Sequence, residues 1–368
     1  MSIMKKYIVV LMIVILLFLT SCDSGNGILE ESSEIIPEQS SEITPPPTVM
    51  ETTLDEKEPP DETPLPLPVI QSIADVGTTT ISGGQLHFVG LRTDGTVLAV
   101  GSHYTSEHDV SEWRDIVSVS AHGNIHGGYR TVGLKYDGTV LETGIIGSFD
   151  FSGWNNIVMV AVGQSGLTVG LKSDGTVVSA SSQHKHILDV TQWREIVAVS
   201  AGYAHIVGLK SDGTVVVTSE DDYDVSDWSD IVAVSAGWYH IVGLKSDGTV
   251  VVSAKRGEFD VSDWSDIVAV SAGWRHIVGL KSDGTVITTT EYAPQYGDES
   301  GPPAIDLDQS DVADWRNIVA VYAGVTYTVG LKSDGTVVGV GFIPGSQWIE
   351  GKRVPSDFFD WRDIAVPL

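Results

Sequence analysis

Short runs of β-branched and small apolar residues recur along this chain between polar, turn-forming residues. One repeat shows the pattern in full, with apolar runs at 231–236, 240–245 and 249–252 and Asp247-Gly248 between the second and third. Runs this short and apolar on both faces are typical of buried strands. Asp-Gly between such runs predicts a hairpin, because the turn needs positive φ. Each repeat therefore predicts three clear strands, with a weaker fourth in the irregular stretch before the next repeat.

The pattern repeats seven times, which decides the architecture. Asp-Gly-Thr occurs at successive spacings of 43, 37, 38, 35, 36 and 51 residues. Each copy is followed by a Trp that stands two residues before Asp, Asn or Glu and then Ile. These tryptophans are Trp113, Trp154, Trp193, Trp228, Trp264, Trp315 and Trp361. Four-stranded units repeated at this period predict an all-β fold, a seven-bladed β-propeller with the tryptophans wedged between blades.

The motif that carries the repeat is Ala-Gly-x-x-His-x-x-Gly-Leu-Lys-x-Asp-Gly-Thr-Val, and it covers nearly all of residues 78–368. It resembles the regulator of chromosome condensation repeat family, including its bacterial members, and the resemblance implies a seven-bladed propeller. Bacterial repeats of this kind often carry Gly-Gln-Cys where this chain reads Asp-Asp-Tyr or Gly-Glu-Phe. The second repeat is irregular at 121–130, and the third has Gly166-Leu167 where others have His.

The two ends of the repeat region complement each other. Residues 361–368 begin a further repeat and stop, whereas 78–84 lack the preceding Trp element. A blade assembled from both ends would remove a free edge strand. We therefore expect a ring that is closed by its termini.

The first residues resemble a bacterial lipoprotein signal. Lys5 and Lys6 precede an apolar run at 7–19 that is too short to span a bilayer as a helix. The run ends in Leu-Thr-Ser-Cys22, similar to a lipobox, which implies a signal peptide at 1–21 and a lipidated Cys22. Because Cys22 is the only cysteine, it forms no internal disulfide. We expect a membrane-anchored, outward-facing protein; the alternative is an ordinary signal peptide whose cleavage site contains Cys.

A segment at 22–68 separates this signal from the repeats at 69–368. Residues 23–68 hold twelve Asp and Glu against one Lys, a net charge of −11, together with nine prolines and no aromatic residue. Such a segment buries too little apolar surface to fold, and proline with self-repelling charge extends it. We expect a disordered, acidic, Pro-rich spacer, although an acidic ligand motif within it is an alternative.

Net charge and the repeats themselves exclude several functions. The chain carries a formal net charge of −28 and no basic stripe, which argues against nucleic-acid partners. A residue present in every blade is a poor candidate for a unique catalytic group, so we expect no enzyme activity. The repeated histidines His87, His205, His240 and His276 are expected to be buried hydrogen-bonding residues. We predict no cofactor, no metal site and a monomer.

Weaker candidates for chemistry lie outside the repeat motif. His103, His108, His122, His126, His184 and His186 lack the spacing of a metal site, and Asp306, Asp308 and Asp311 lack that of a calcium loop. The long insertion at 291–310 and the shorter loop at 345–354 are the two candidate functional loops.

One set of residues points to partner binding. The two residues after each Ala-Gly join equivalent strands, so they should emerge on one face of the ring. Three consecutive repeats place there the residues Tyr203, Trp238, Tyr239, Trp274 and Arg275. Trp, Tyr and Arg dominate binding hot spots. The alternative is that these rings only pack on neighbouring turns.

We therefore expect a binding module for an extracellular or envelope protein or a glycan. The family also includes guanine-nucleotide exchange and chromatin-binding members, functions that the signal peptide and acidic charge exclude here. It further includes a secreted bacterial inhibitor of beta-lactamase, so an inhibitor of an extracellular enzyme is a second hypothesis. A glycan-active enzyme is a third, because a propeller can assemble a pocket from distant blades.

Overall fold

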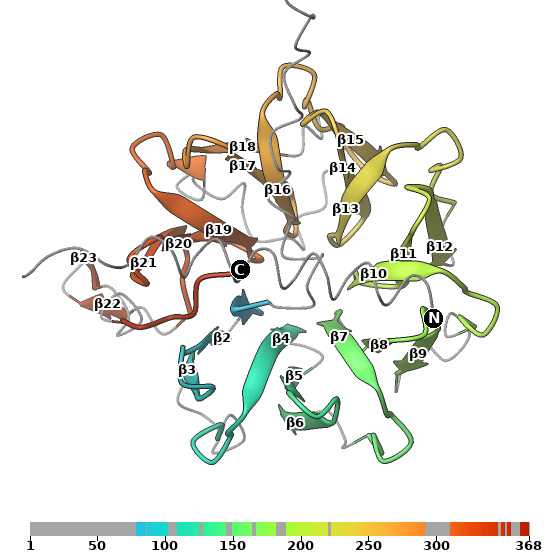
Figure 1. Cartoon of the computed structure of the whole chain (residues 1–368). Helices are drawn as coiled ribbons and strands as arrows, with labels where there is room; N and C mark the ends of the chain where they lie inside the picture. Colours follow the sequence, from blue (N-terminus) through green and yellow to red (C-terminus); the bar gives the residue numbers. More distant parts are fainter. Residues whose placement is uncertain are drawn as a thin grey trace, which may run out of the picture. The chain divides into compact units, whose positions relative to one another are not determined.

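The structure, a computed structural model, describes residues 79–367 apart from short gaps. The gaps are 86, 102–108, 125–127, 145–148, 164–166, 182–188, 220–221, 291–309, 345–346, 350–351 and 355–360. The described residues form seven antiparallel three-stranded sheets arranged around a central axis (Figure 1). The predicted seven-bladed β-propeller is confirmed.

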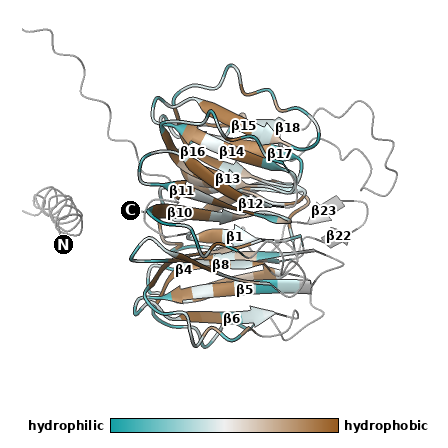
Figure 2. Ribbon diagram, turned by 90° about the vertical axis from the view of Figure 1, so that its right-hand side faces the viewer, coloured by the Kyte–Doolittle hydropathy of each residue, from teal (hydrophilic) through white to brown (hydrophobic). Residues whose placement is uncertain are grey.

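Each blade runs from an inner strand at the axis to an outer strand at the rim. In this order the blades are β1 (Ile81–Gly83), β2 (His87–Leu91) and β3 (Val97–Gly101); β4 (Ile116–Asn124), β5 (Gly128–Lys135) and β6 (Val140–Gly144); β7 (Ile157–Val162), β8 (Thr168–Lys172) and β9 (Val177–Ala180); β10 (Ile196–Ala201), β11 (His205–Lys210) and β12 (Val215–Ser219); β13 (Ile231–Ala236), β14 (His240–Lys245) and β15 (Val250–Ala254); β16 (Ile267–Ala272), β17 (His276–Lys281) and β18 (Val286–Thr290); and β19 (Ile318–Ala323), β20 (Tyr327–Lys332) and β21 (Val337–Gly341). Figure 2 shows that hydrophobic residues follow the strands, whereas the turns are mostly hydrophilic.

The Asp-Gly-Thr turns form the predicted hairpins. In the fifth blade, Gly248 has a φ of 80°. The Asp247 carboxylate accepts hydrogen bonds from the backbone N–H and the hydroxyl of Thr249, at 2.9 and 2.6 Å. These bonds stabilise the ionised carboxylate and lower the pKa of Asp247. The aspartates thus set hairpin geometry, as expected of residues that recur in every blade.

The residue before the Ile of each repeat joins one blade to the next. Asp230 has a φ of 59°, a conformation that Asp and Asn tolerate better than most residues. Its carbonyl accepts a 2.9 Å hydrogen bond from Ser246 of its own blade, while Ile231 donates at 3.1 Å to Gly213 of the blade before. The other six positions, with φ between 56° and 61°, are Asp115, Asn156, Glu195, Asp266, Asn317 and Asp363.

The seven described blade sheets have three strands each, and the weaker fourth strand predicted for each repeat is not among them. In most blades the stretch after the third strand falls partly in the gaps, at 102–108, 145–148, 182–188 and 291–309, so there the fourth strand stays a prediction. The described residues immediately before Trp228 form local turns instead. Asp224 accepts hydrogen bonds from the backbone N–H and the hydroxyl of Ser226, at 3.1 and 2.7 Å. Trp228 then donates its backbone N–H to Val225 at 3.1 Å. Backbone groups committed to Asx and β-turns are not available for a ladder.

The repeated tryptophans lie between blades, as predicted. The Trp264 ring packs on Gly279, where an added Cβ would lie 2.6 Å from the ring. Trp264 also belongs to a buried cluster with Val242, Leu244 and Val250 of the preceding blade. The hydrophobic core of this propeller therefore lies between neighbouring blades, and the glycine makes room for the ring.

A belt of side-chain hydrogen bonds joins the inner strands around the axis. In five of the seven junctions a serine hydroxyl accepts the backbone N–H of the next inner strand. The pairs are Ser82 with Ala121, Ser120 with Val162, Ser200 with Ala236, Ser235 with Ala272 and Ser271 with Ala323, at 2.9 to 3.0 Å. The sixth junction is made by the Tyr322 hydroxyl, which donates to the carbonyl of Gly83. At the remaining junction Ala161 stands at the serine position and has no hydroxyl.

The ring closes through both ends of the repeat region, as predicted. Ile364 pairs with Arg92, and Ala365 donates its backbone N–H to Leu91 at 2.8 Å. Leu91 in turn donates to Thr80 at 2.7 Å, so two chain segments together complete the inner edge of the first blade. Trp361 lies against Gly90 in the way that Trp264 lies against Gly279.

Other predictions fall at the edge of the described residues. The loop predicted at 345–354 contains a two-stranded hairpin, β22 (Gln347–Ile349) with β23 (Lys352–Val354), which corrects that expectation. The signal peptide, Cys22 and the segment 22–68 lie outside the described residues, as do residues 291–309 of the long insertion. Within the described ranges, no helix is long and apolar enough to cross a membrane.

Closure predicts that the last residues stabilise the whole ring. We expect Ile364→Ala to lower the free energy of unfolding by about 2–5 kcal/mol, because Ile364 is only 1% exposed and packs on Gly90. Chemical denaturation measures this. The control is Val366→Ala, two residues away and 36% exposed, which should change it by less than about 0.5 kcal/mol. Equal effects of the two substitutions would contradict closure by the C-terminal segment.

Candidate partner-binding face

Tight turns between the inner and middle strands place the predicted site residues. Gly237 donates its backbone N–H to the carbonyl of His240 at 2.9 Å, which closes a turn with Trp238 and Tyr239 at its centre. The backbone N–H of Trp238 donates to the carbonyl of Gly273 in the next blade at 3.3 Å. The turn is thus fixed to its own blade and to its neighbour.

The glycine that begins this turn is required by the close approach of the next blade. A Cβ on Gly237 would lie 2.6 Å from the carbonyl oxygen of Gly273 and 2.5 Å from the His240 ring. Both distances are shorter than any real Cβ contact, so the turns of adjacent blades can lie side by side only with glycine here.

The predicted residues come together as a continuous stack. Trp238 stacks on Tyr239, with centroids 5.4 Å apart and planes at 14°, and contacts Trp274 on the other side at 4.4 Å. Tyr203 lies beside both Trp238 and Tyr239, at 5.5 and 5.9 Å. The Arg275 guanidinium lies 5.2 Å from the Trp274 ring. We call Tyr203, Trp238, Tyr239, Trp274, Arg275 and Arg256 the aromatic face.

Arg256 is a member of the aromatic face that the sequence reasoning missed. Its guanidinium lies 4.5 Å above the Tyr239 ring, at the opposite end of the stack from Arg275. Strand pairing brings it there, because Ala254 at the end of β15 pairs with His240, and Lys255 then donates its N–H to the Tyr239 carbonyl at 2.9 Å. The repeat pattern could have predicted this, because the third strand of a blade is antiparallel to the second and ends level with its start.

The aromatic face borders the central cavity of the propeller. This cavity, of about 190 Å³, is lined by the inner strands of the seven blades and includes Trp238 and Trp274 in its wall. The Trp238 indole N–H is buried and has no hydrogen-bond partner among the described residues. A buried donor of this kind needs an acceptor, which a bound water or ligand in the cavity would supply.

Beneath the aromatic face, the repeated histidines are buried and uncharged. His205, His240 and His276 are at most 2% exposed, and burial lowers the pKa of His205 and His240 to about 3 and of His276 to about 4. His276 Nε2 lies 3.1 Å from the Thr328 hydroxyl of the next blade, and His87 makes the same contact with Thr131. These distances fit the predicted role as buried hydrogen-bonding residues.

Aromatic residues cover the histidines where this chain departs from the bacterial motif. Tyr223 of Asp-Asp-Tyr lies 4.7 Å from the His205 ring, and Phe259 of Gly-Glu-Phe lies 4.4 Å from the His240 ring. The departure from Gly-Gln-Cys therefore has a packing role, since each ring shields an imidazole from water.

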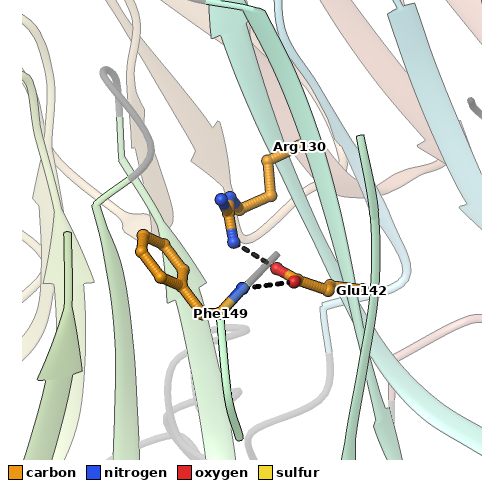
Figure 3. Close-up of polar contacts among 3 residues, drawn as sticks. All are labelled: Arg130, Glu142 and Phe149. Carbon is orange, nitrogen blue, oxygen red and sulfur yellow. Dashed lines mark hydrogen bonds and ion pairs between the residues drawn. The ribbon is translucent and has the colours of Figure 1, made fainter. Parts of the chain in front are cut away.

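The second blade replaces this histidine by a buried ion pair (Figure 3). Arg130 is 1% exposed, forms an ion pair with Glu142, and lies 4.0 Å from the centre of the Phe149 ring. Glu142 also accepts a 2.6 Å hydrogen bond from the Phe149 backbone N–H. Burial lowers the pKa of Arg130 and raises that of Glu142, and the ion pair opposes both shifts. A pair this enclosed holds the segment before the third blade in place.

The remaining candidates do not come together as a site. Among the described residues, no three His, Cys, Asp or Glu side chains are grouped to hold a metal ion. His122 lies in the cavity wall, with its pKa lowered to about 4 by burial. His103, His108, His126, His184, His186, Asp306 and Asp308 lie outside the described residues, and Asp311 has no described metal-binding partner. The predicted absence of enzyme activity, metal and cofactor stays a prediction, as does the role of the aromatic face.

Comparison with protein families identifies one repeat. The model of the regulator of chromosome condensation (RCC1) repeat matches residues 231–253, which span β13 to β15. This match supports the resemblance drawn from the motif. A search of curated proteins found no match.

Solved structures show the same fold at low sequence identity. The CRINKLY WD40 ectodomain of the Arabidopsis thaliana receptor kinase ACR4 has a TM-score of 0.57 at 16% identity, over 72% of this chain and 95% of that one. The ectodomain of the Physcomitrella patens receptor kinase CR4 has a TM-score of 0.55 at 15% identity, over 74% and 76%. Prp20p of Saccharomyces cerevisiae has a TM-score of 0.49 at 16% identity, over 72% and 82%. At such identities the two ectodomains establish the fold alone: this chain folds as a β-propeller like theirs.

The buried histidines predict a pH-dependent stability. His240 has a folded pKa of about 3 against about 6.5 unfolded, so between these values the unfolded chain binds a proton that the fold does not. The free energy of unfolding should therefore fall as the pH drops below about 6.5, by up to ~1.4 kcal/mol per pH unit for each such histidine.

The test is His240→Leu, because Leu167 occupies the equivalent position of the third blade and is fully buried. Urea unfolding measures the free energy of unfolding between pH 6 and 4.5. In the variant this free energy should fall less steeply with decreasing pH than in the parent, by the amount that corresponds to the uptake of about one proton. An unchanged slope would mean that His240 is protonated in the folded state.

Proposed function

We propose that this chain is a lipid-anchored, outward-facing binding module that holds a protein or glycan partner on its aromatic face. One observation carries the proposal: three consecutive blades bring together Tyr203, Trp238, Tyr239 and Trp274, with a guanidinium at each end of the stack. Large rings with few rotatable bonds, beside arginine forks, supply binding energy at small entropic cost.

Packing between blades alone does not account for this cluster. The turn geometry repeats in other blades, yet the equivalent turns carry Gln85 in the first blade and Val325-Thr326 in the seventh. The fold therefore does not need aromatic residues here. Side chains that the turn does not require, gathered on one face, favour a binding role.

The site is tested by affinity capture from envelope and culture fractions. The bait is the chain from residue 22 with Cys22→Ser, and the variant is Trp238→Ala with Trp274→Ala. We expect a partner that the parent captures and that the variant captures at least tenfold less, because the variant lacks two hot-spot residues of about 2 kcal/mol each. Added oligosaccharides that compete would identify a glycan.

The matched control is Tyr136→Ala, an exposed ring (87%) in the Asp-Gly turn of the second blade, at the other end of the strands. It should leave capture unchanged. If both variants capture what the parent captures, the aromatic face only packs and the proposal is wrong. The melting temperature of each variant, measured alongside, excludes loss of binding through unfolding.

The anchor is tested at Cys22. In a bacterial host, the parent should incorporate labelled palmitate and sediment with membranes, because two or more acyl chains give stable anchoring. Cys22→Ser should lose the label and appear in the soluble fraction, whereas the neighbouring Ser24→Ala should behave as the parent. Membrane sedimentation of unlabelled Cys22→Ser would contradict lipid anchoring.

A further inference from the structure

We propose that the central cavity of the propeller binds one uncharged hexose ring, the end residue of a glycan, through serine hydroxyls of three consecutive blades. This inference rests on the proposed function and narrows its partner to a glycan, whose end enters the cavity beside the aromatic face. Half-buried hydroxyls with protons to donate, in a cavity wall without charged side chains, support it.

The cavity reaches the aromatic face. Its wall is formed by the inner strands and extends to the glycines that begin the turns, such as Gly237 and Gly273. Trp238 and Trp274 line the same end. The cavity measures about 190 Å³, and at about 10–15 Å³ for each water-sized group it holds roughly a dozen of them or more, about the size of one hexose ring.

Three serine hydroxyls in the wall have protons to donate into the cavity. Ser200, Ser235 and Ser271 are half-buried, and each hydroxyl oxygen accepts a backbone N–H of the next blade at 2.9 to 3.0 Å. A hydroxyl that accepts on one side still has its own proton to donate. Within the described ranges these three protons have no protein acceptor, so an oxygen atom of a ligand in the cavity can accept them.

The equivalent positions in the first three blades differ. Ser82 donates its proton to the Ala121 carbonyl at 3.3 Å and is only 4% exposed. Ser120 is buried, and Ala161 has no hydroxyl. The available hydroxyls therefore lie on one side of the axis, in the three blades that also carry the aromatic face. A one-sided set of donors suits a ligand with oxygen atoms along one edge better than an ion centred on the axis.

The charge of the wall favours a neutral ligand. Among the described residues that line the cavity there is no Asp, Glu, Lys or Arg. His122 is uncharged at neutral pH as well, because burial lowers its pKa to about 4. An anion would find no cation in the wall, and the net charge of −28 would repel it. A divalent cation would find no carboxylate.

The wall also matches the mixed character of a sugar ring, which has hydroxyls along its rim and apolar C–H groups on its faces. The methyl groups of Ala236 and Ala272 follow two of the serines in the wall. The indole N–H of Trp238 is a further donor, and stacking between Tyr239 and Trp274 fixes its ring. Groups held in place before binding lose little entropy when a ligand binds.

The experiment uses the ¹⁵N-labelled chain from residue 22 with Cys22→Ser. It is titrated in turn with D-glucose, D-galactose, D-mannose and N-acetyl-D-glucosamine. The indole N–H resonance of Trp238 is assigned by its loss in Trp238→Phe. We expect at least one of these sugars to shift this resonance saturably, with a Kd of about 1 mM, as is typical of so small a ligand.

Ser235→Ala should raise the Kd of that sugar about fivefold, because it removes one donated hydrogen bond. The matched control is Ser82→Ala, which also loses a hydrogen bond of the belt but no proton that is available to the cavity. It should leave the Kd unchanged. The melting temperature of both variants should fall by a similar amount, which separates loss of the sugar contact from loss of stability.

Three other results would overturn the proposal. If none of these sugars shifts the Trp238 resonance, the cavity holds water alone. A shift with sodium phosphate and with no sugar means that the hydroxyls hold an anion. Equal weakening by Ser235→Ala and Ser82→Ala means that the sugar binds outside the three hydroxyls. Capture of a protein partner that Trp238→Ala with Trp274→Ala loses, without any response to sugar, overturns this proposal and leaves the proposed function intact.

Discussion

The propeller depends on satisfying the backbone N–H groups along the unpaired edge of each inner strand. An inner strand pairs only with the middle strand of its own blade, and the described sheets contain no ladder between one blade and the next. A serine hydroxyl of one blade meets the free N–H of the next, at 2.9 to 3.0 Å. At these five junctions one hydroxyl satisfies a backbone donor without β-pairing between the blades.

The fold could be predicted from the sequence because its key features are repeated. Asp-Gly-Thr, the repeated Trp and the residue before Ile each hold a special backbone or packing position, and seven copies of each left little choice of architecture. A fourth strand was expected in the irregular stretch after each third strand, but the described residues at 224–228 make local hydrogen bonds instead. Strand propensity does not reveal whether a ladder partner exists.

Part of the aromatic face could be predicted from the sequence for the same reason. Equivalent turns must share a face, so the repeat alone was enough to group Tyr203, Trp238, Tyr239, Trp274 and Arg275. Arg256 was missed because it follows the third strand, outside the repeated motif, and only the pairing of Ala254 with His240 returns it to the stack. The Arg130–Glu142 pair was missed because it lies in the irregular second repeat, where one substitution removed the histidine.

Completion of the first blade by Ile364 and Ala365 has a consequence for the order of synthesis. The blade whose strands leave the ribosome first is the last to be finished, since its inner edge waits for residues made almost 300 positions later. Until then Phe88 and Gly90 lack the indole of Trp361 that covers them. A partly made chain is therefore an open arc with exposed apolar ends, and the full-length product alone can hide them.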